Sequence, residues 1–422
     1  MKEKLRAWWF HKQGLDGSLT NNSLPFREVP GVGSYSPQAV LDMAGWSRSV
    51  GGSGPYLSLF ARAGTSRADA DAAVVDLSIH ELPSARGCTY VLPKNDFALG
   101  LRVAQGFADQ AQIAQGKKYF AVTDDEVDRL CAGIIDALAD GPLDPAGLKD
   151  RLGDLVRNFG EEGKKRGLSN SLPLATSKLQ THGRIRRVPI NGRLDQQKYA
   201  YTLWDQLPYD SGVGAESPFT DLARRFYQWT GPASTAQFQW FSGLGVKAAN
   251  DALAPLGLIP IAPGSDLLIS PDEMADFEAF TPPSIPHYAL ISSMDSLLLL
   301  RRDIASLVDD ADLERRVTAE KGLVEIGRLS DFSSNVIVDR GRVIGFWEYD
   351  TAAKEIVWST FTPQASPPFR EGPGVGSGSD LAAIVQRMQT FITTDLGDAR
   401  SFSLDSPASR RPRIDALRNP SW

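Results

Sequence analysis

The feature that most limits the fold of this chain is a β-hairpin signal that comes directly after a series of helix signals. Residues 184–204, RIRRVPINGRLDQQKYAYTLW, contain two runs rich in β-branched and aromatic residues, with Asn191-Gly192 between them. An Asn-Gly pair in this setting is the strongest short-range sign of a tight hairpin turn. Helices followed by a hairpin give the outline of a winged helix, in which one helix can enter the major groove of DNA and the hairpin forms the wing.

Helix boundaries upstream of the hairpin support this interpretation. Thr123 starts an amphipathic run with Glu126 three residues later, which is a capping box, and Gly141 marks a stop. The same order of signals recurs in a third unit and, less clearly, in a first unit, without a visible sequence repeat. In the first unit, residues 68–82, ADADAAVVDLSIHEL, are expected to form one helix.

The sequence therefore predicts an α+β fold of tandem winged-helix (helix-turn-helix) domains, followed by a C-terminal α/β region with a small antiparallel sheet. The predicted boundaries are 1–34 for an N-terminal extension, 35–121, 122–210 and 211–285 for three winged helices, 286–400 for the C-terminal region and 401–422 for a flexible tail.

Composition narrows the function classes. The 422 residues carry a net charge of −6, so binding to nucleic acid requires a local basic face on an acidic protein. Two cysteines and four scattered histidines show no ligand spacing, and we expect no metal and no cofactor. The N-terminus has no signal-peptide pattern and no apolar stretch reaches 18 residues, so we expect a cytoplasmic monomer without a membrane span.

Basic residues gather around the predicted third helix and wing of the second unit. Lysine and arginine at such positions are what phosphate contacts require, and hydroxyl groups can add to them. The candidate DNA-binding residues are Lys178, Thr181, His182, Arg184, Arg186, Arg187, Arg193 and Lys198. The alternative is an ordinary solvated surface, on which Arg184 and Arg186 protect an edge strand.

Five stretches carry a resemblance to a known family. In chain order they are AGWSRSVGGSGPYLSLFAR, RGCTYVLPKND, GPASTAQFQWFSGL, MDSLLLLRRD and VIVDRGRVIGFWEYD. Together, between about residues 36 and 395, they resemble the winged-helix AlkZ-like and YcaQ-like DNA glycosylases. The resemblance implies three tandem winged helices around a concave basic channel for duplex DNA. It also implies cleavage of the N-glycosidic bond of alkylated or crosslinked bases, with a Gln-x-Gln or Gln-x-Asp motif just before a tyrosine-leucine helix.

The chain departs from the family at that motif. The expected position holds Ser47 and Ser49, with Arg48 between them. Hydrolysis of an N-glycosidic bond needs a group that orients water or stabilises positive charge on the sugar, and a serine hydroxyl does this weakly. Asp42 and Asp295 are candidate substitute carboxylates. The alternative roles are an exposed helix residue for Asp42 and a structural partner of Arg301 or Arg302 for Asp295.

Two further features allow both a functional and a structural interpretation. Gln237-Phe238-Gln239 looks like the motif, but it falls in the third unit. There, Phe238 and Phe241 have the spacing of core residues on one helix face, and the glutamines would face solvent or neighbouring backbone. Near the C-terminus, Arg410, Arg411 and Arg413 form either a basic tail that reaches phosphates or a terminus without a role.

The sequence leaves three hypotheses for function. The first is a DNA-binding protein on the glycosylase scaffold, which recognises duplex DNA, including alkylated or damaged DNA, and has lost the catalytic motif. The second is an active DNA glycosylase that uses non-standard residues on bulky or alkylated bases. The third is an interaction scaffold that does not bind DNA, a class with which the acidic net charge agrees.

Overall fold

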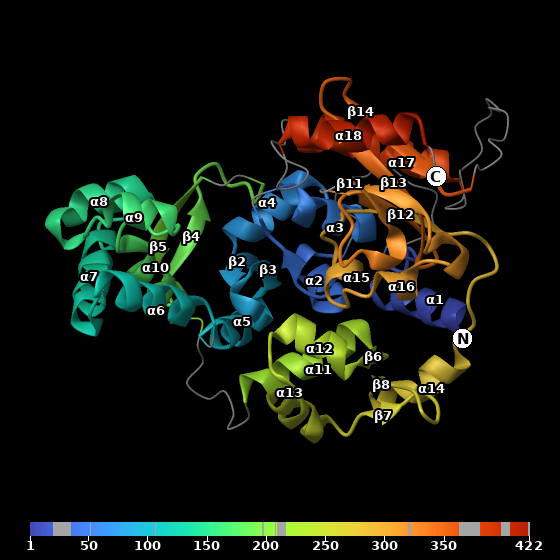
Figure 1. The fold of residues 1–422 in the computed structure, drawn as a ribbon, viewed down its shortest axis with the longest axis horizontal. Coiled ribbons are helices and arrows are strands. Elements are labelled where there is room, and N and C mark those ends of the chain that lie inside the picture. The colour runs from blue at the N-terminus through green and yellow to red at the C-terminus, as the bar shows by residue number, and fades with distance from the viewer. Residues whose placement is uncertain are drawn as a thin grey trace.

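The structure, a computed structural model, describes residues 1–19, 35–50, 52–105, 107–195, 198–206, 208, 217–319, 322–362, 380–397 and 406–420. A lobe made of the second unit stands to one side of a larger body (Figure 1). The first unit lies at the centre of the molecule, the third unit lies below it, and the C-terminal sheet lies on the far side from the lobe. The α+β class with small antiparallel sheets is confirmed. The division into winged helices stays a prediction.

The first unit combines four helices with a three-stranded antiparallel sheet of order β1-β3-β2. Its elements are α2 (Pro37–Ala44), β1 (Ser47–Arg48), α3 (Gly54–Ala63), α4 (Arg67–Val75), β2 (Ile79–Pro83), β3 (Thr89–Pro93) and α5 (Phe97–Ala104). Ser36 caps α2 by accepting a hydrogen bond from the Ala39 N–H, and Pro37 occupies the first turn. The single helix expected over 68–82 is wrong, because α4 ends at Val75 and β2 begins at Ile79.

In its described part, the second unit has five helices and one hairpin. They are α6 (Ala108–Phe120), α7 (Asp124–Leu138), α8 (Pro145–Leu152), α9 (Gly160–Lys165), α10 (Leu172–Thr181), β4 (Ile185–Pro189) and β5 (Tyr199–Leu203). Helix α6, which the predicted boundaries place in the first unit, is included because it packs against α10. Thr123 caps α7 as predicted, with its hydroxyl accepting from the Glu126 N–H. The hairpin is present, but Pro189 pairs with Tyr199, so residues 190–198 form a long connection instead of a two-residue turn.

This connection is long because part of it is drawn into the body. Leu194 is buried in a core cluster that includes residues of α3 and of the C-terminal sheet. The backbone N–H of Leu194 donates to the Tyr56 hydroxyl, and the buried Arg193 guanidinium pairs with Asp195 and donates to the Leu396 carbonyl. The loop therefore fixes the second unit against the body.

The third unit packs an aromatic core against the first. Its elements are α11 (Pro218–Thr230), β6 (Ala233–Ser234), α12 (Thr235–Ser242), α13 (Val246–Leu253), β7 (Ile259–Pro260), β8 (Leu267–Ile269) and α14 (Pro271–Ala279). Phe238 and Phe241 are buried, as their spacing predicts. Gln237 is also buried and forms a reciprocal capping box with Ser234, so this glutamine has a structural role.

The C-terminal region contains a four-stranded antiparallel sheet of order β14-β13-β12-β9. Its elements are β9 (Tyr288–Ile291), α15 (Ser296–Leu299), α16 (Ile304–Leu307), β10 (Arg316–Ala319), β11 (Gly322–Glu325), β12 (Asn335–Asp339), β13 (Arg342–Asp350), β14 (Glu355–Thr360), α17 (Leu381–Thr390) and α18 (Pro407–Arg418). The N-terminal helix α1 (Lys2–Lys12) joins this region, with Trp8 and Trp9 packed inward.

Helix α18 differs from the flexible tail expected over residues 401–422. Arg410 and Arg413 are buried, and Arg413 forms an ion pair with the buried Glu348 of β13 at 2.8 Å. Two of the three arginines of the expected basic tail therefore hold α18 on the sheet. Within the described ranges, none of the helices has the length and apolar character needed to cross a membrane.

Candidate functional site

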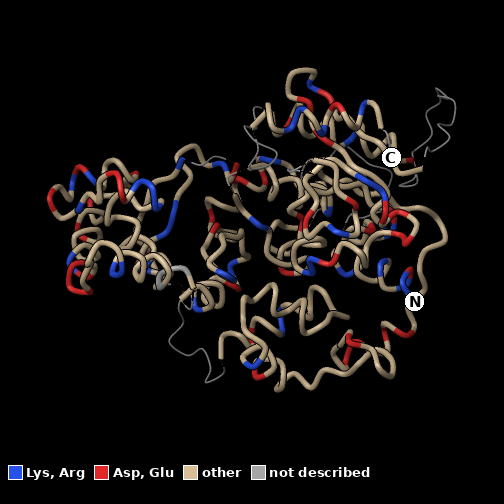
Figure 2. The backbone as a smooth tube through the Cα atoms, viewed as in Figure 1, with Lys and Arg blue, Asp and Glu red and all other residues tan. Residues whose placement is uncertain are grey.

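The eight candidate DNA-binding residues fall into different environments. His182, Arg184 and Lys198 are exposed on the second unit. Arg186 and Arg187 are half-buried on β4, where the Arg186 guanidinium lies over the Trp204 ring, 5.6 Å from its centroid. Figure 2 shows that the basic residues of β4 lie on the side of the lobe that faces the body.

The other three candidates are engaged within the protein. Thr181 is fully buried, and its hydroxyl donates to the Lys178 carbonyl. Arg193 is buried with Asp195, as described above. The Lys178 amine donates to the Asp128 carboxylate at 2.6 Å. Thr181 and Arg193 therefore have no access to a phosphate, and Lys178 reaches one only by leaving an acidic partner.

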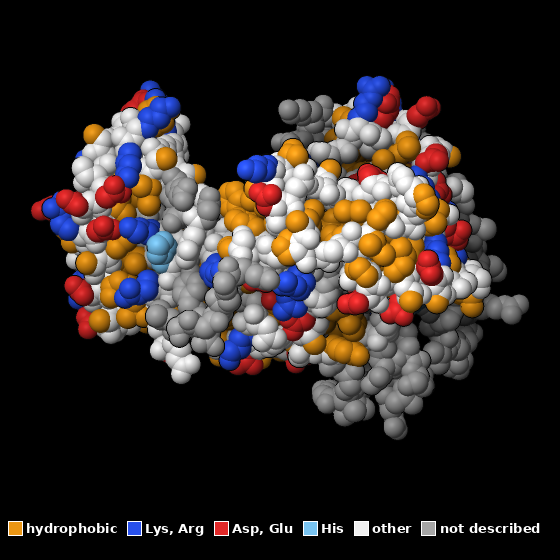
Figure 3. Space-filling model, turned by 90° about the horizontal axis from the view of Figure 1, so that it is seen from below, with side chains coloured by type: hydrophobic (Ala, Val, Ile, Leu, Met, Phe, Trp, Pro, Cys, Tyr) orange, Lys and Arg blue, Asp and Glu red, His pale blue; other side chains and the backbone are white. Residues whose placement is uncertain are grey.

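A cavity of about 350 Å³ lies between the second unit and the first. This size is within the range of small-molecule sites, roughly 300–1,000 Å³. Figure 3, which views the molecule from below, shows a hollow between the lobe and the body. The cavity is lined by Glu81, Pro83, Gly87, Thr89, Gln112, Pro145, Leu172, Pro173, Thr176, Ser177, Gln180, Arg187, Tyr199 and Tyr201.

A charged pair and two phenol rings occupy one wall of the cavity. Arg187 Nη1 lies 3.6 Å from Glu81 Oε1, and the same guanidinium lies 4.5 Å from the centre of the Tyr199 ring. Tyr201, the cross-strand neighbour of Arg187, has its pKa raised to about 12 chiefly by burial. Burial lowers the pKa of Arg187, but the two tyrosines and Glu81 outweigh this effect and the pKa is raised, so Arg187 stays charged.

The position at which the family motif is expected lies next to this wall. Ser47 and Ser49 are both buried, on β1 and directly after it. The Ser49 hydroxyl donates to Glu81 Oε2 at 2.8 Å, and the Ser49 N–H donates to the Thr89 carbonyl. Arg48 points elsewhere, since its guanidinium donates to Thr89 O and lies over the Tyr90 ring.

Glu81 was missed in the sequence because its segment was assigned to a helix. In the structure Asp76 ends α4, and its carboxylate accepts from the Ser78 N–H, while Leu77 adopts a φ of 60°. The chain then enters β2, where alternation directs Glu81 to the face that also carries Ser47. The sequence offered no clear strand signal here, because Ile79–Pro83 reads Ile-His-Glu-Leu-Pro, in which apolar and polar residues do not alternate.

The two candidate carboxylates lie outside the cavity lining. Asp295 is fully buried, and its carboxylate is held by two hydrogen bonds from Arg62, at 2.7 and 2.8 Å. Burial alone would raise the pKa of Asp295, but Arg62, the Leu297 N–H and the Ser58 hydroxyl hold it below its ordinary value. The partner of Asp295 is therefore Arg62 and not Arg301 or Arg302.

Asp42 sits on α2 and is partly buried. Burial and the neighbouring Asp96 raise its pKa, while Arg225, 3.9 Å away, opposes this effect. Because Asp42 lies outside the cavity lining, it is poorly placed to act on a group bound there.

A second group of basic residues was also missed. The guanidinium of Arg86 lies 3.4 Å from the centre of the Trp240 ring, and that of Arg302 lies 3.7 Å from it. Arg86 is exposed, adopts a φ of 59° and directly precedes Gly87, which lines the cavity. Stacking on an aromatic ring leaves the N–H edge of a guanidinium available to an anion.

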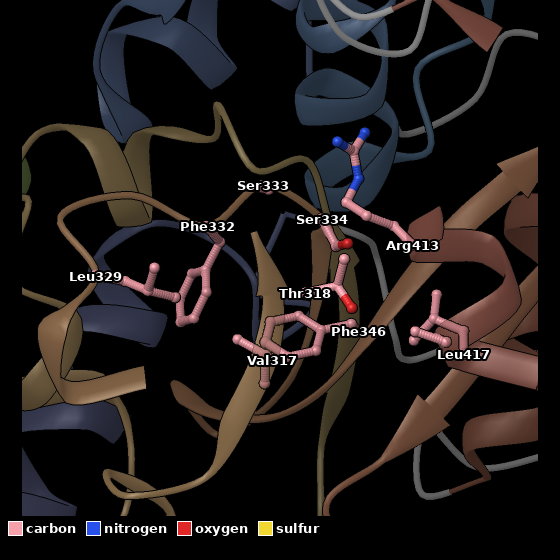
Figure 4. A pocket seen from close by; sticks show the side chains of 10 residues that line it. Val317, Thr318, Leu329, Phe332, Ser333, Ser334, Phe346, Arg413 and Leu417 are labelled. Carbon is pink, nitrogen blue, oxygen red and sulfur yellow. The ribbon is translucent and has the colours of Figure 1, made fainter. Parts of the chain in front are cut away.

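A hollow in the C-terminal region is too small for a ligand. It lies between β10, β13 and α18, and its volume of about 10 Å³ holds no more than one water molecule. Figure 4 shows Val317, Phe332 and Phe346 filling it, with the Arg413 guanidinium turned away. Among the residues that the structure describes, no group of three or more histidine, cysteine or acidic side chains could hold a metal ion.

The chain is similar to known proteins in sequence pattern and in fold. A family model described as "DNA glycosylase AlkZ-like" matches residues 51–391, so the match begins two residues after Ser49. A search of curated proteins gives no match. The solved structure of the Streptomyces sahachiroi DNA glycosylase AlkZ is similar with a TM-score of 0.62 and 18% identity, over 94% of this chain and 97% of that chain.

Proposed function

The chain belongs to the AlkZ-like DNA glycosylase family, and from this premise we propose that it recognises damaged duplex DNA in the hollow between the second unit and the body. One protein molecule would bind each damaged position. The observation that carries the proposal is the cavity between β2, α10 and the β4–β5 hairpin, with the basic side chain of Arg187 in its lining.

The cavity walls have the chemistry of a nucleobase site. Proteins that extrude a base from the helix hold it by stacking on aromatic rings and by hydrogen bonds to its edge. Tyr199 and Tyr201 supply rings, with centroids 5.4 Å apart, and Gln180 and Thr176 of α10 are polar residues in the same lining. A damaged base is the easier one to extrude, because its stacking and pairing are weaker.

Exposed cations near the hollow support contact with the DNA backbone. Arg184 is exposed at the open end of the β4–β5 hairpin, Lys198 is exposed at the end where the connection joins β5, and Arg86 is exposed beside the cavity. Each phosphate that a lysine or arginine neutralises makes the slope of log K against log salt more negative by about 0.9. Phosphate contacts by these three residues predict a salt slope of about −3. A slope of this size is small, as expected for a protein whose net charge is negative.

The test is the salt dependence of binding to a fluorescent duplex, measured by anisotropy. Arg184→Ala combined with Lys198→Ala should weaken binding and make the slope less negative by about 2. The control is Arg328→Ala with Lys354→Ala, which removes two exposed charges from the C-terminal region and should leave the slope unchanged. Binding without salt dependence, or no binding at all, would instead favour the interaction-scaffold hypothesis.

A second candidate function is hydrolysis of the N-glycosidic bond of an alkylated base. The observation that favours it is the carboxylate of Glu81, which lines the cavity and is bonded to Ser49 at the expected motif position. Release of free 7-methylguanine from a duplex by the purified protein is the direct test.

A further inference from the structure

We propose that Glu81 is the catalytic carboxylate of this chain and that Ser49 is its positioning residue. The inference rests on the second candidate function, base excision, and extends it by assigning the groups that act. Three features of the described residues carry it: the register of the first sheet, the contacts of the Glu81 carboxylate and the cavity beside it.

The register of the sheet places Glu81 where the family motif would act. Ser47 on β1 and Glu81 on β2 both pair with Val91 of the central strand β3. Directly paired residues of antiparallel strands share one face, so Ser47 and Glu81 lie on the same face of the sheet. Ser49, two residues after Ser47, continues that face.

The side chain of Glu81 spans the central strand. Its Oε2 atom reaches the Ser49 hydroxyl at 2.8 Å, although β3 separates the two backbones. The carboxylate therefore lies over β3, beside the two positions at which relatives carry a glutamine and a glutamine or aspartate. The serine side chains at these two positions are short, and the Glu81 side chain extends from β2 to the second of them.

The carboxylate is held in one orientation yet faces the cavity. Ser49 fixes Oε2, and the Arg187 guanidinium lies 3.6 Å from Oε1. The Glu81 side chain keeps 20% of its surface exposed and lines the same cavity as Tyr199 and Tyr201. A base stacked on one of those rings would lie in the same cavity as the carboxylate.

The chemistry balances with water as the only co-reactant. In a 7-alkylguanine nucleotide the base carries a positive charge, and cleavage of the C1′–N9 bond sends the bonding electrons to the base, which leaves neutral. Water forms the new bond to C1′, and its proton passes to the Glu81 carboxylate and then to solvent. The negative carboxylate also stabilises the positive charge that develops on the sugar before water adds.

The experiment compares isosteric variants on duplexes that contain 7-methylguanine or a bulkier N7-alkylguanine. Base release is measured in single turnover at saturating protein, and binding is measured separately by anisotropy. Glu81→Gln should lower the rate by about 100-fold or more, the usual contribution of an acid–base group, while the dissociation constant changes by less than about threefold. Glu278→Gln, at an exposed position of α14, is the matched control and should keep the wild-type rate.

Ser49 is tested by rescue. Ser49→Ala should lower the single-turnover rate with little change in binding, and Ser49→Thr should recover most of the rate, because it keeps the hydroxyl that donates to Glu81. A purely structural serine would give equal losses in both variants. Thermal unfolding of each variant shows whether the fold is retained.

The outcomes separate this inference from the functions on which it rests. If the wild-type protein releases base and Glu81→Gln releases it at the same rate, the assignment of Glu81 is wrong while base excision stands. If the wild-type protein binds damaged duplex but releases no base from either substrate, both base excision and this inference fail while duplex recognition stands. Loss of release with retained binding in Glu81→Gln supports the proposal.

Discussion

Replacement of Asp295 by asparagine tests whether this residue has a structural or a catalytic role. Asp295 and Arg62 expose 0% and 1% of their side chains, so the ion pair is removed from solvent. The Asp295 carboxylate accepts two hydrogen bonds from Arg62, one from the Ser58 hydroxyl and one from the Leu297 N–H that begins α15. Asparagine keeps the shape of the side chain but leaves the buried charge of Arg62 without its partner.

The expected loss follows from that uncompensated charge. Breaking a buried ion pair from one side typically costs about 3–5 kcal/mol. At 1.4 kcal/mol for each factor of ten, this multiplies the unfolding equilibrium constant at least about 100-fold. Because the pKa of Asp295 is lowered in the folded state, its contribution is fully present above the ordinary value of 3.8 and is lost as the pH falls below it.

The assay is urea unfolding of Asp295→Asn and wild-type protein at pH 7, followed by tryptophan fluorescence. Asp154→Asn, at an exposed position of the second unit, is the control and should change the free energy of unfolding by less than about 0.5 kcal/mol. A loss below about 1 kcal/mol for Asp295→Asn would refute the structural reasoning. Loss of base release with an unchanged free energy of unfolding would instead support a catalytic role for Asp295.

Two further predictions concern the contact between the second unit and the body. Burial, with a smaller effect of Arg186, lowers the pKa of His80 to about 3. The NMR resonances of the His80 ring should therefore not titrate between pH 8 and 5. A titration midpoint near 6.5 would contradict the burial of this ring. The pKa of His80 is lower in the folded protein than in the unfolded chain. As the pH falls from 6.5 toward 3, the unfolded chain therefore binds a proton at His80 that the folded protein does not, and the free energy of unfolding decreases. Leu194→Ala should destabilise the protein by about 2–5 kcal/mol and speed proteolysis within residues 190–198, whereas Ile190→Ala, at a position that is 59% exposed, should do neither.

Local signals in the sequence predicted the elements that are determined locally. Ser36 and Thr123 cap helices as expected, and the spacing of Phe238 and Phe241 identified the buried face of α12. The hairpin after the helices of the second unit was also found, because β-rich runs on both sides of Asn191-Gly192 indicate paired strands. The class of the fold followed from these elements and from the resemblance of five ordered stretches.

The features that the sequence analysis missed depend on partners distant in the chain. Leu194 lengthens the hairpin connection because it packs in the core of the body, and Asp295 pairs with Arg62, which is 233 positions away. Arg413 lies on α18, and its partner in the buried ion pair, Glu348, lies on β13, far away in the chain. Glu81 was assigned to a helix because the end of α4 is made by an aspartate turn, without the glycine or proline that usually marks a boundary.

Photo-crosslinking from the damaged position shows directly whether an extruded base enters the cavity between the second unit and the body. A duplex that carries 5-iodouracil in a mismatch is irradiated in complex with the protein, and the crosslinked peptides are identified by mass spectrometry. If the base binds in this cavity, crosslinks are expected to the segment that holds Tyr199 and Tyr201, since both rings line the cavity between the second unit and the body. Crosslinks confined to α13, α18 or another surface away from this cavity would contradict such binding.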